Sequence, residues 1–304
     1  MLEQFNFAFA ITGPVLLLLL LGWAIRQLNL VDHQFVAQAN TLVFNVAMPT
    51  ILFFAISNQP LTVSLDWSLI LVGLGGTLLF VAILLLVGRL VPEDQRGVFV
   101  QGSYRGNLAI LGIALAVATY GESVLPLIGI YIAVVTTAYN VVAIWLLNAS
   151  NVGKRIVKNP ILIGIVAGVI ASAIELDIPE LFINTGSYIS ALTLPLALLC
   201  IGATIEFKSL IGHGRSIALA VLFKLIFSPL LLVGLGILFD LGALQLGILY
   251  FMAASPTATA SYIMARQMTQ HGALAAEIVA VTTTLGVISY TIGIAMLNSL
   301  GFVV

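Results

Sequence analysis

Two short polar segments interrupt apolar stretches of the chain, and their residue types suit the binding of an anion. One segment contains Arg105, Gly106 and Asn107, and the other contains Ser255, Pro256 and Thr257. A proline inside a helix removes a backbone hydrogen bond, and hydrocarbon tolerates the freed carbonyl only where it is buried in protein or faces water. Helix ends that meet inside a membrane present free N–H groups and a positive dipole end. We therefore expect two helix breaks, centred on Gly106 and Pro256, that together bind an anion.

Arg105 is the charged residue closest to these breaks. A charged side chain within a membrane helix costs about 2.5–3.5 kcal/mol on insertion scales, so it needs a reason to be there. Arg105 is either a counter-ion for an anionic substrate or a fixed cation that holds the broken helices together, and its planar fork suits a carboxylate. A cap on freed carbonyls is the alternative role. Lys224 lies nearer the end of its stretch, and we expect its side chain to reach back to the interface.

Other polar and proline residues could line the same site. Asn140 follows Thr136 by four positions, so both side chains share one face of a helix. Asn45 precedes Pro49 by one turn, and Pro49 and Pro195 form a second pair of expected helix breaks. These side chains could line a cavity or could form hydrogen bonds between helices. We favour cavity lining for Asn107 and Asn140.

The sequence offers little support for metal or enzyme chemistry. The three histidines, His33, His213 and His271, are dispersed over loops, so we expect no metal site and no cofactor. Glu277 enters only the first turn of the last apolar stretch, and no carboxylate lies in the centre of a stretch. No nucleophile and base pair is evident either. A proton relay of carboxylates and an intramembrane enzyme are both disfavoured.

The composition identifies the elements that must position these residues. The chain has 304 residues, of which 61% are hydrophobic and only 8% are charged, too few charges to cover a soluble surface. A membrane-spanning helix needs about 20 mostly apolar residues. We predict an all-α polytopic membrane protein with ten spans, numbered one to ten, over residues 7–25, 36–57, 67–88, 97–119, 123–148, 160–175, 181–205, 216–239, 243–265 and 274–300.

The loop charges support this count and predict an orientation. Nine of the 11 basic residues follow odd-numbered spans: Arg26, Arg89, Arg96, Lys154, Arg155, Lys158, Lys208, Arg215 and Arg266. The even-numbered loops carry only acidic charges. By the positive-inside rule the basic side is cytoplasmic. We therefore expect a multi-pass protein of the inner (plasma) membrane with both termini outside the cytoplasm. No basic cluster suggests a nucleic-acid partner.

The chain also carries signs of an internal repeat. Three residue pairs are each separated by 146 positions: Pro14 and Pro160, Pro49 and Pro195, and Asp94 and Asp240. Because each half holds five spans, an odd number, the second half must be inverted relative to the first. We predict a first repeat over 1–148, a cytoplasmic linker over 149–159 and a second repeat over 160–304. Inverted repeats with broken helices are typical of secondary transporters.

Four segments resemble the auxin efflux carrier family, which belongs with the bile acid:sodium symporters in a wider superfamily. The first two run from Asn40 to Pro49 (NTLVFNVAMP) and from Tyr104 to Gly112 (YRGNLAILG). The others run from Leu194 to Gly202 (LPLALLCIG) and from Ser255 to Thr259 (SPTAT). The resemblance extends over essentially the whole chain.

The resemblance implies an arrangement that the spacing alone does not. Spans one, two, six and seven would form a scaffold that often dimerises, and spans three to five and eight to ten would form a moving transport domain. Spans four and nine would cross at their breaks, with Asn107 and Pro256 at the crossing and Asn45 and Pro49 on the scaffold face. Substrates of such carriers are organic anions, including auxin and small carboxylates such as malonate. The chain lacks both a proline at the span-four break and the acidic residue of the sodium site in bile acid symporters.

These observations favour a secondary transporter of a small organic anion, auxin-like or malonate-like, with the lipid bilayer as its surroundings and elevator-type alternating access as its mechanism. A sodium-coupled symporter of the bile-acid type is the nearest alternative. A membrane receptor that binds a ligand without moving it is another, although no soluble signalling domain is apparent in the sequence.

Overall fold

The computed structural model describes residues 2–60, 65–147, 159–204 and 214–302, and the regular elements of this part of the chain are all helices. Most of the predicted linker, residues 149–158, lies outside these ranges. So do several residues used for the charge pattern and the histidine comparison: Lys154, Arg155, Lys158, Lys208 and His213.

The first part of the chain forms helices whose starts follow from capping residues. The side chain of Asp32 accepts a hydrogen bond from Phe35 N at 2.7 Å, and that of Asp66 accepts one from Leu69 N at 3.0 Å. The elements are α1 (Leu2–Gln27), α2 (His33–Leu42), the π-helical turn η1 (Val43–Ala47), α3 (Met48–Ser57), α5 (Trp67–Val87), the short turns η2 (Gly88–Leu90) and η3 (Glu93–Gln95), α6 (Arg96–Tyr104), the π-helical turn η4 (Leu108–Gly112), α7 (Ile113–Tyr120), the short turn η5 (Glu122–Val124) and α8 (Leu125–Leu146).

The second part begins with a helix whose first residue is a proline, a position where the missing N–H does no harm. The elements are α10 (Pro160–Ala173), α11 (Glu180–Ala203), α12 (Gly214–Leu222), the π-helical turn η7 (Phe223–Phe227), α13 (Ser228–Leu238), α14 (Ala243–Ala254), α15 (Thr259–Met268) and α16 (Gly272–Ser299).

Seven helical segments in the described ranges are long and apolar enough to cross a membrane, and three shorter apolar helices accompany them. The shorter helices are Leu108–Tyr120, Pro160–Ala173 and Ala243–Ala254, within the predicted spans four, six and nine. Spans four and nine are short because each is interrupted near its middle. The structure therefore confirms an all-helical membrane protein with these long and short apolar helices.

The structure corrects the expected breaks at Pro49 and Pro195. Helix α11 continues through Pro195 to Ala203, and α2, η1 and α3 follow one another directly on either side of Pro49. The π-helical turn before Pro49 shifts the bonding pattern, so that Met48 N donates to Val43 O, five residues back. Such a turn lets a helix continue past a proline with a bend.

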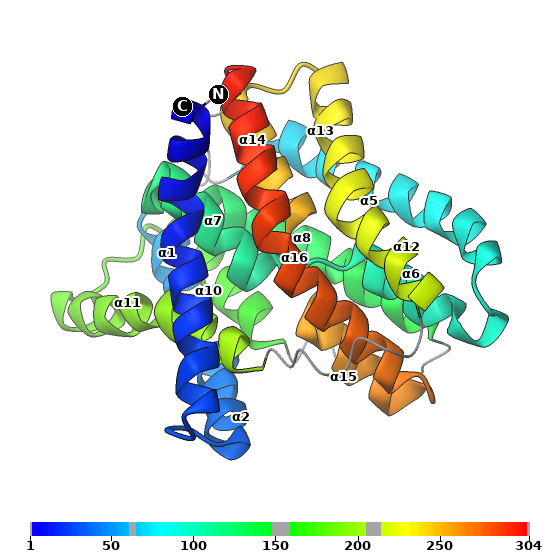
Figure 1. Ribbon diagram of the computed structural model, residues 1–304. Coiled ribbons are helices and arrows are strands. Elements are labelled where there is room, and N and C mark those ends of the chain that lie inside the picture. The colour runs from blue at the N-terminus through cyan, green and yellow to red at the C-terminus, as the bar shows by residue number, and fades with distance from the viewer. Residues whose placement is uncertain (1, 61–64, 148–158, 205–213, 303–304) are drawn as a thin grey trace.

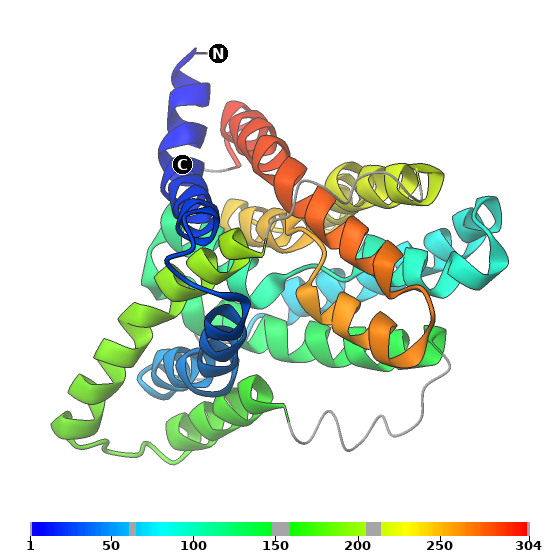
Figure 2. The same ribbon diagram turned by 60° about the horizontal axis from the view of Figure 1, so that its bottom comes forward.

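The helices form two groups (Figure 1). In the first group α1 packs on α11, α3 packs on α10 and α11, and glycines allow the close approach: a side chain on Gly164 would meet Pro49, and one on Gly168 would meet Phe53. In the second group α13 packs on α5 and α14, α5 on α8, and α15 on α16. Figure 2 shows the first group at the left and the second at the right.

Contacts between α1 and α16 and between α3 and α8 join the two groups. The N-terminal end of α1 and the C-terminal end of α16 lie at one end of the molecule, whereas α2 and α15 lie at the opposite end (Figure 1).

We predict that Gly202→Ala destabilises the first group by about 1–3 kcal/mol, the usual effect of overpacking. A methyl group on Gly202 would overlap the carbonyl of Leu19 on α1, just as one on Gly22 would overlap the carbonyl of Leu199. Thermal melting of the detergent-solubilised protein, followed by size-exclusion chromatography, measures the loss. Gly75→Ala is the control, because Gly75 is exposed with no atom within 4 Å of an added Cβ. Equal melting temperatures for the two variants would contradict this packing.

Candidate functional site

The two interrupted helices meet at their breaks. Residues 105–107 between α6 and η4, and residues 255–258 between α14 and α15, are non-helical and lie antiparallel; we call them together the crossover. Asn107 N donates to Pro256 O at 2.7 Å, and Ala258 N donates to Arg105 O at 2.9 Å. The two extended segments thereby satisfy part of the backbone that the helices leave unpaired, which a membrane interior requires.

The residue types explain why the chain leaves the helix at these positions. Pro256 has no N–H to donate to a helix, and it disfavours helical geometry in the residue before it. Gly106 has no Cβ, and a Cβ there would overlap Ser255 Oγ. The Thr257 hydroxyl donates to Gly102 O, near the end of α6, at 2.6 Å, and Thr257 N donates to Thr282 Oγ1 at 3.1 Å. Short polar side chains thus cap the interrupted ends.

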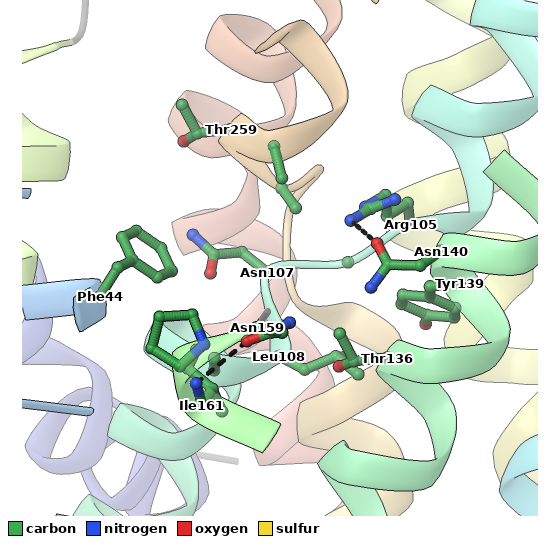
Figure 3. A pocket seen from close by; sticks show the side chains of 15 residues that line it. Phe44, Arg105, Asn107, Leu108, Thr136, Tyr139, Asn140, Asn159, Ile161 and Thr259 are labelled. Carbon is green, nitrogen blue, oxygen red and sulfur yellow. Dashed lines mark hydrogen bonds between the residues drawn. The ribbon is translucent and has the colours of Figure 1, made fainter. Parts of the chain in front are cut away.

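A cavity of about 200 Å³ lies beside the crossover. Its walls come from both groups of helices, as Figure 3 shows from close by. The lining residues are Phe44, Arg105, Gly106, Asn107, Leu108, Ala109, Thr136, Tyr139, Asn140, Asn159, Pro160, Ile161, Ala258, Thr259 and Ala260. No acidic side chain is among them.

Three helices begin at this cavity. Residues 107–109, 159–161 and 258–260 are the caps and first residues of the helix that starts at η4, of α10 and of α15. The first N–H groups of a helix have no partner within it, and that end carries a partial positive charge. Asn159 caps α10 by accepting from Ile161 N at 3.0 Å, but the other two starts have no side-chain cap. Their free N–H groups favour an anion in the cavity.

The Arg105 guanidinium is held at the edge of this cavity by neutral partners. Nη2 donates to Asn140 Oδ1 at 2.7 Å, and Nη1 lies 3.2 Å from the sulfur of Met264. The side chain is only 6% exposed. The guanidinium donates to no backbone carbonyl in the described ranges, so its contacts there do not include a cap on a freed helix carbonyl. Because no carboxylate neutralises it in an ion pair in those ranges, its positive charge adds to that of the helix ends.

Three polar side chains in the cavity wall, those of Asn107, Thr136 and Thr259, have no hydrogen-bond partner among the described residues. The amide of Asn107 is 8% exposed and lies between Phe44 and the crossover in Figure 3. The hydroxyl of Thr136 lies on α8, one turn before Asn140. An amide offers both donors and acceptors, so Asn107 is equipped to bind a small polar ligand.

Other residues expected at the site lie outside the cavity or form hydrogen bonds with backbone carbonyls. Ser255 and Thr257 are fully buried, and their hydroxyls bond the carbonyls of Met252 and Gly102. Pro256 faces a much smaller apolar cavity near Thr12. Asn45 is exposed on η1, and Pro49 packs on α10, so neither lines the cavity beside the crossover. Of this segment it is Phe44 that reaches the cavity.

Lys224 is the largest departure from expectation. Its side chain is 0% exposed, and Nζ donates to Ala253 O at 2.9 Å instead of reaching the membrane surface. The reason is the position of Ala253 in the last turn of α14, where a carbonyl lacks its helical partner. The break in span nine thus leaves a carbonyl free to accept a hydrogen bond from the Lys224 ammonium, which keeps this side chain inside the protein.

Sequence reasoning also missed Phe44, Tyr139 and Asn159 as lining residues. Only Asn159 carried a recognisable signal, since asparagine followed by proline is typical of a helix start. The other two line the cavity only because helices distant in sequence come together.

In the described ranges, no group of three or more His, Cys, Asp or Glu side chains could hold a metal ion. The free cysteine, Cys200, is buried in α11.

Comparison with known proteins identifies the family of this chain. The family model described as "Membrane transport protein" matches residues 9–151 and 145–294, so the chain belongs to this family. This confirms the resemblance to the auxin efflux carriers and makes the chain a membrane transporter and not an enzyme.

Two relatives cover nearly the whole chain. The "Putative malonate transporter" of Rhizobium meliloti (strain 1021) is 26% identical over 92% of this chain and 94% of its own. An uncharacterized transporter of Methanocaldococcus jannaschii is 24% identical over 90% of this chain and 94% of its own.

We predict that Gly106→Ala disrupts the crossover. The added Cβ would lie 3.0 Å from Lys224 Nζ and 3.1 Å from Ser255 O, in addition to overlapping Ser255 Oγ. The hydrogen bonds on either side of Gly106 should break, with a lower melting temperature and loss of ligand binding. Gly234→Ala is the control, because no atom lies within 4 Å of its added Cβ. A Gly106→Ala protein that melts and binds like wild type would rule out the tight crossing.

Proposed function

We propose that this transporter carries a small organic anion, with a malonate-like dicarboxylate as the first candidate. The observation that carries the proposal is the cavity at which three helix N-termini and Arg105 converge, without an acidic side chain in its lining. Each of these features favours negative charge. None of them favours a cation or an apolar solute.

The size of the cavity supports a small substrate. Pockets for drug-sized ligands measure about 300–1,000 Å³, and this cavity measures about 200 Å³. A short carboxylate fits that volume better than a bile acid or another bulky anion. The name of the Rhizobium meliloti relative agrees with a dicarboxylate.

The proposed mechanism is elevator-type alternating access between two inverted repeats, over residues 1–148 and 160–304. In support, the interruptions after Tyr104 and after Ala254 occupy similar places in the two halves. The group of α1, α3, α10 and α11 would be the scaffold, and the group that contains the crossover would move. Dimerisation through the scaffold is part of the same proposal.

The proposed location is the inner (plasma) membrane, with both termini outside the cytoplasm. Asn159, at the start of α10, lines the cavity and directly follows the basic linker segment. If that segment is cytoplasmic, the cavity extends towards the cytoplasmic side. The conformation is then the inward-facing one.

The decisive experiment is uptake of radiolabelled malonate by proteoliposomes that contain the purified protein, with protein-free liposomes as the baseline. We expect uptake and exchange against internal malonate. Binding without exchange would favour a receptor, and strict dependence on sodium would favour the bile-acid-type symporter. Transport of a cation or a neutral solute, with no anion moved or bound, would refute the proposal.

We predict that Arg105→Gln weakens malonate binding about ten-fold or more, because a hydrogen bond to a charged group contributes about 1.5–3 kcal/mol. Arg105→Lys keeps the charge but loses the planar fork, so the affinity of this variant for malonate should lie between those of wild type and Arg105→Gln. Isothermal titration calorimetry on the purified proteins gives the affinities. Unchanged affinity in a folded Arg105→Gln protein would assign this residue to structure alone.

We predict that Asn107→Leu also weakens malonate binding, by about ten-fold, because it removes a polar side chain that faces the cavity without another partner. Asn45→Leu is the matched control: the same substitution on an exposed amide outside the cavity. Equal losses in the two variants would show that the effect is not local to the cavity.

A further inference from the structure

Lys224 is a buried cation whose role the proposed function leaves open. It lies in the π-helical turn η7 and is 0% exposed. Arg105, Lys224 and Glu277 are the buried charged residues of the described ranges. A charge is rarely buried in a membrane protein without a function.

The ammonium of Lys224 lies at the negative end of an interrupted helix. Ala253 O accepts hydrogen bonds from Lys224 Nζ at 2.9 Å and from Ser228 Oγ at 3.2 Å. This carbonyl belongs to the last turn of α14, where the helix dipole favours a positive charge. In transporters with broken helices, such C-terminal ends and unwound carbonyls are the places that coordinate a coupling cation.

One residue of the crossover, Gly106, lies between the same ammonium and the cavity. Nζ lies 3.0 Å from the position that a Cβ of Gly106 would occupy, and Gly106 itself lines the cavity. Lys224 does not line it. The charge therefore acts on the cavity across the backbone of the crossover, where the absence of a side chain at Gly106 allows the close approach.

No carboxylate in the described ranges forms an ion pair with Lys224. Its ammonium donates instead to the carbonyl oxygen of Ala253, and carbonyl oxygens are among the ligands that hard metal cations such as Ca²⁺ and Mg²⁺ take in proteins. A negative ligand in the adjacent cavity would supply the missing counter-charge.

We propose that Lys224 is a resident cation: its ammonium occupies the position at which a coupling metal cation would bind, and it stabilises the anion in the cavity as a positioning residue. The inference rests on the proposed anion transport and deepens it. Anion binding then needs no inorganic cation, because the positive charge is covalently part of the chain.

The test compares malonate affinity in sodium, potassium and choline chloride at one ionic strength, by calorimetry on the full-length protein. We expect wild type to bind equally in the three salts. Lys224→Gln can keep a hydrogen bond to Ala253 O without the charge, and its affinity in choline should fall about ten-fold or more, as expected for a charge acting across a few ångströms of protein. Lys224→Arg should keep most of the affinity.

Ser228→Ala is the matched control, because it removes the other hydrogen bond to the same carbonyl but no charge. It should bind like wild type in all three salts. Thermal melting confirms that each variant is folded, and if Lys224→Gln does not fold, the salt series on wild type and on Lys224→Arg decides.

The inference is overturned if wild type requires sodium or potassium. It is also overturned if folded Lys224→Gln binds as tightly as wild type, or if Lys224→Arg loses as much affinity as Lys224→Gln. Failure of wild type to bind any dicarboxylate would overturn the proposed function together with the inference. Normal wild-type binding with an unaffected Lys224→Gln overturns the inference alone.

Discussion

The structure depends on how two interrupted helices satisfy their backbone inside an apolar environment. An unpaired N–H or C=O in hydrocarbon costs several kcal/mol, so a helix break must find partners within the protein. The antiparallel contact of residues 105–107 with 255–258 supplies some of them, and the side chains of Thr257, Ser255 and Lys224 supply others. The carbonyl ends of α6 and α14 are capped in this way, whereas two of the helix starts at the cavity have no side-chain cap.

The carbonyl ends and the N–H ends of the interrupted helices therefore give the two sides of the crossover opposite partial charges. Carbonyl ends attract cations, and the chain provides one in Lys224. N–H ends attract anions, and the chain leaves space for one in the cavity. Under the proposed function Arg105, which donates to Asn140, would add its positive charge to that of these N–H ends. The chemistry of the site thus comes from backbone geometry as much as from side chains.

The sequence predicted much of this arrangement because apolar length and proline chemistry act locally. The stretches that form helices and the interruptions after Tyr104 and Ala254 follow from such local signals. Predictions failed where a neighbouring element decides the outcome. Helix α11 continues past Pro195, a π-helical turn takes up the bend before Pro49, and Lys224 turns inward towards a carbonyl on α14. Phe44 and Tyr139 carry no local signal of their place in the cavity wall.

The mixed origin of the cavity wall has a consequence for how tightly a ligand could be held. Phe44 and residues 159–161 belong to the helices around α3 and α10, whereas Arg105, Asn107 and Thr259 belong to the crossover and its neighbours. If the two groups slide past each other as proposed, a ligand bound tightly to both of them would slow that movement. Rapid turnover would then require that the crossover supplies most of the binding energy, and that Phe44 and Asn159 contact the ligand only before the movement.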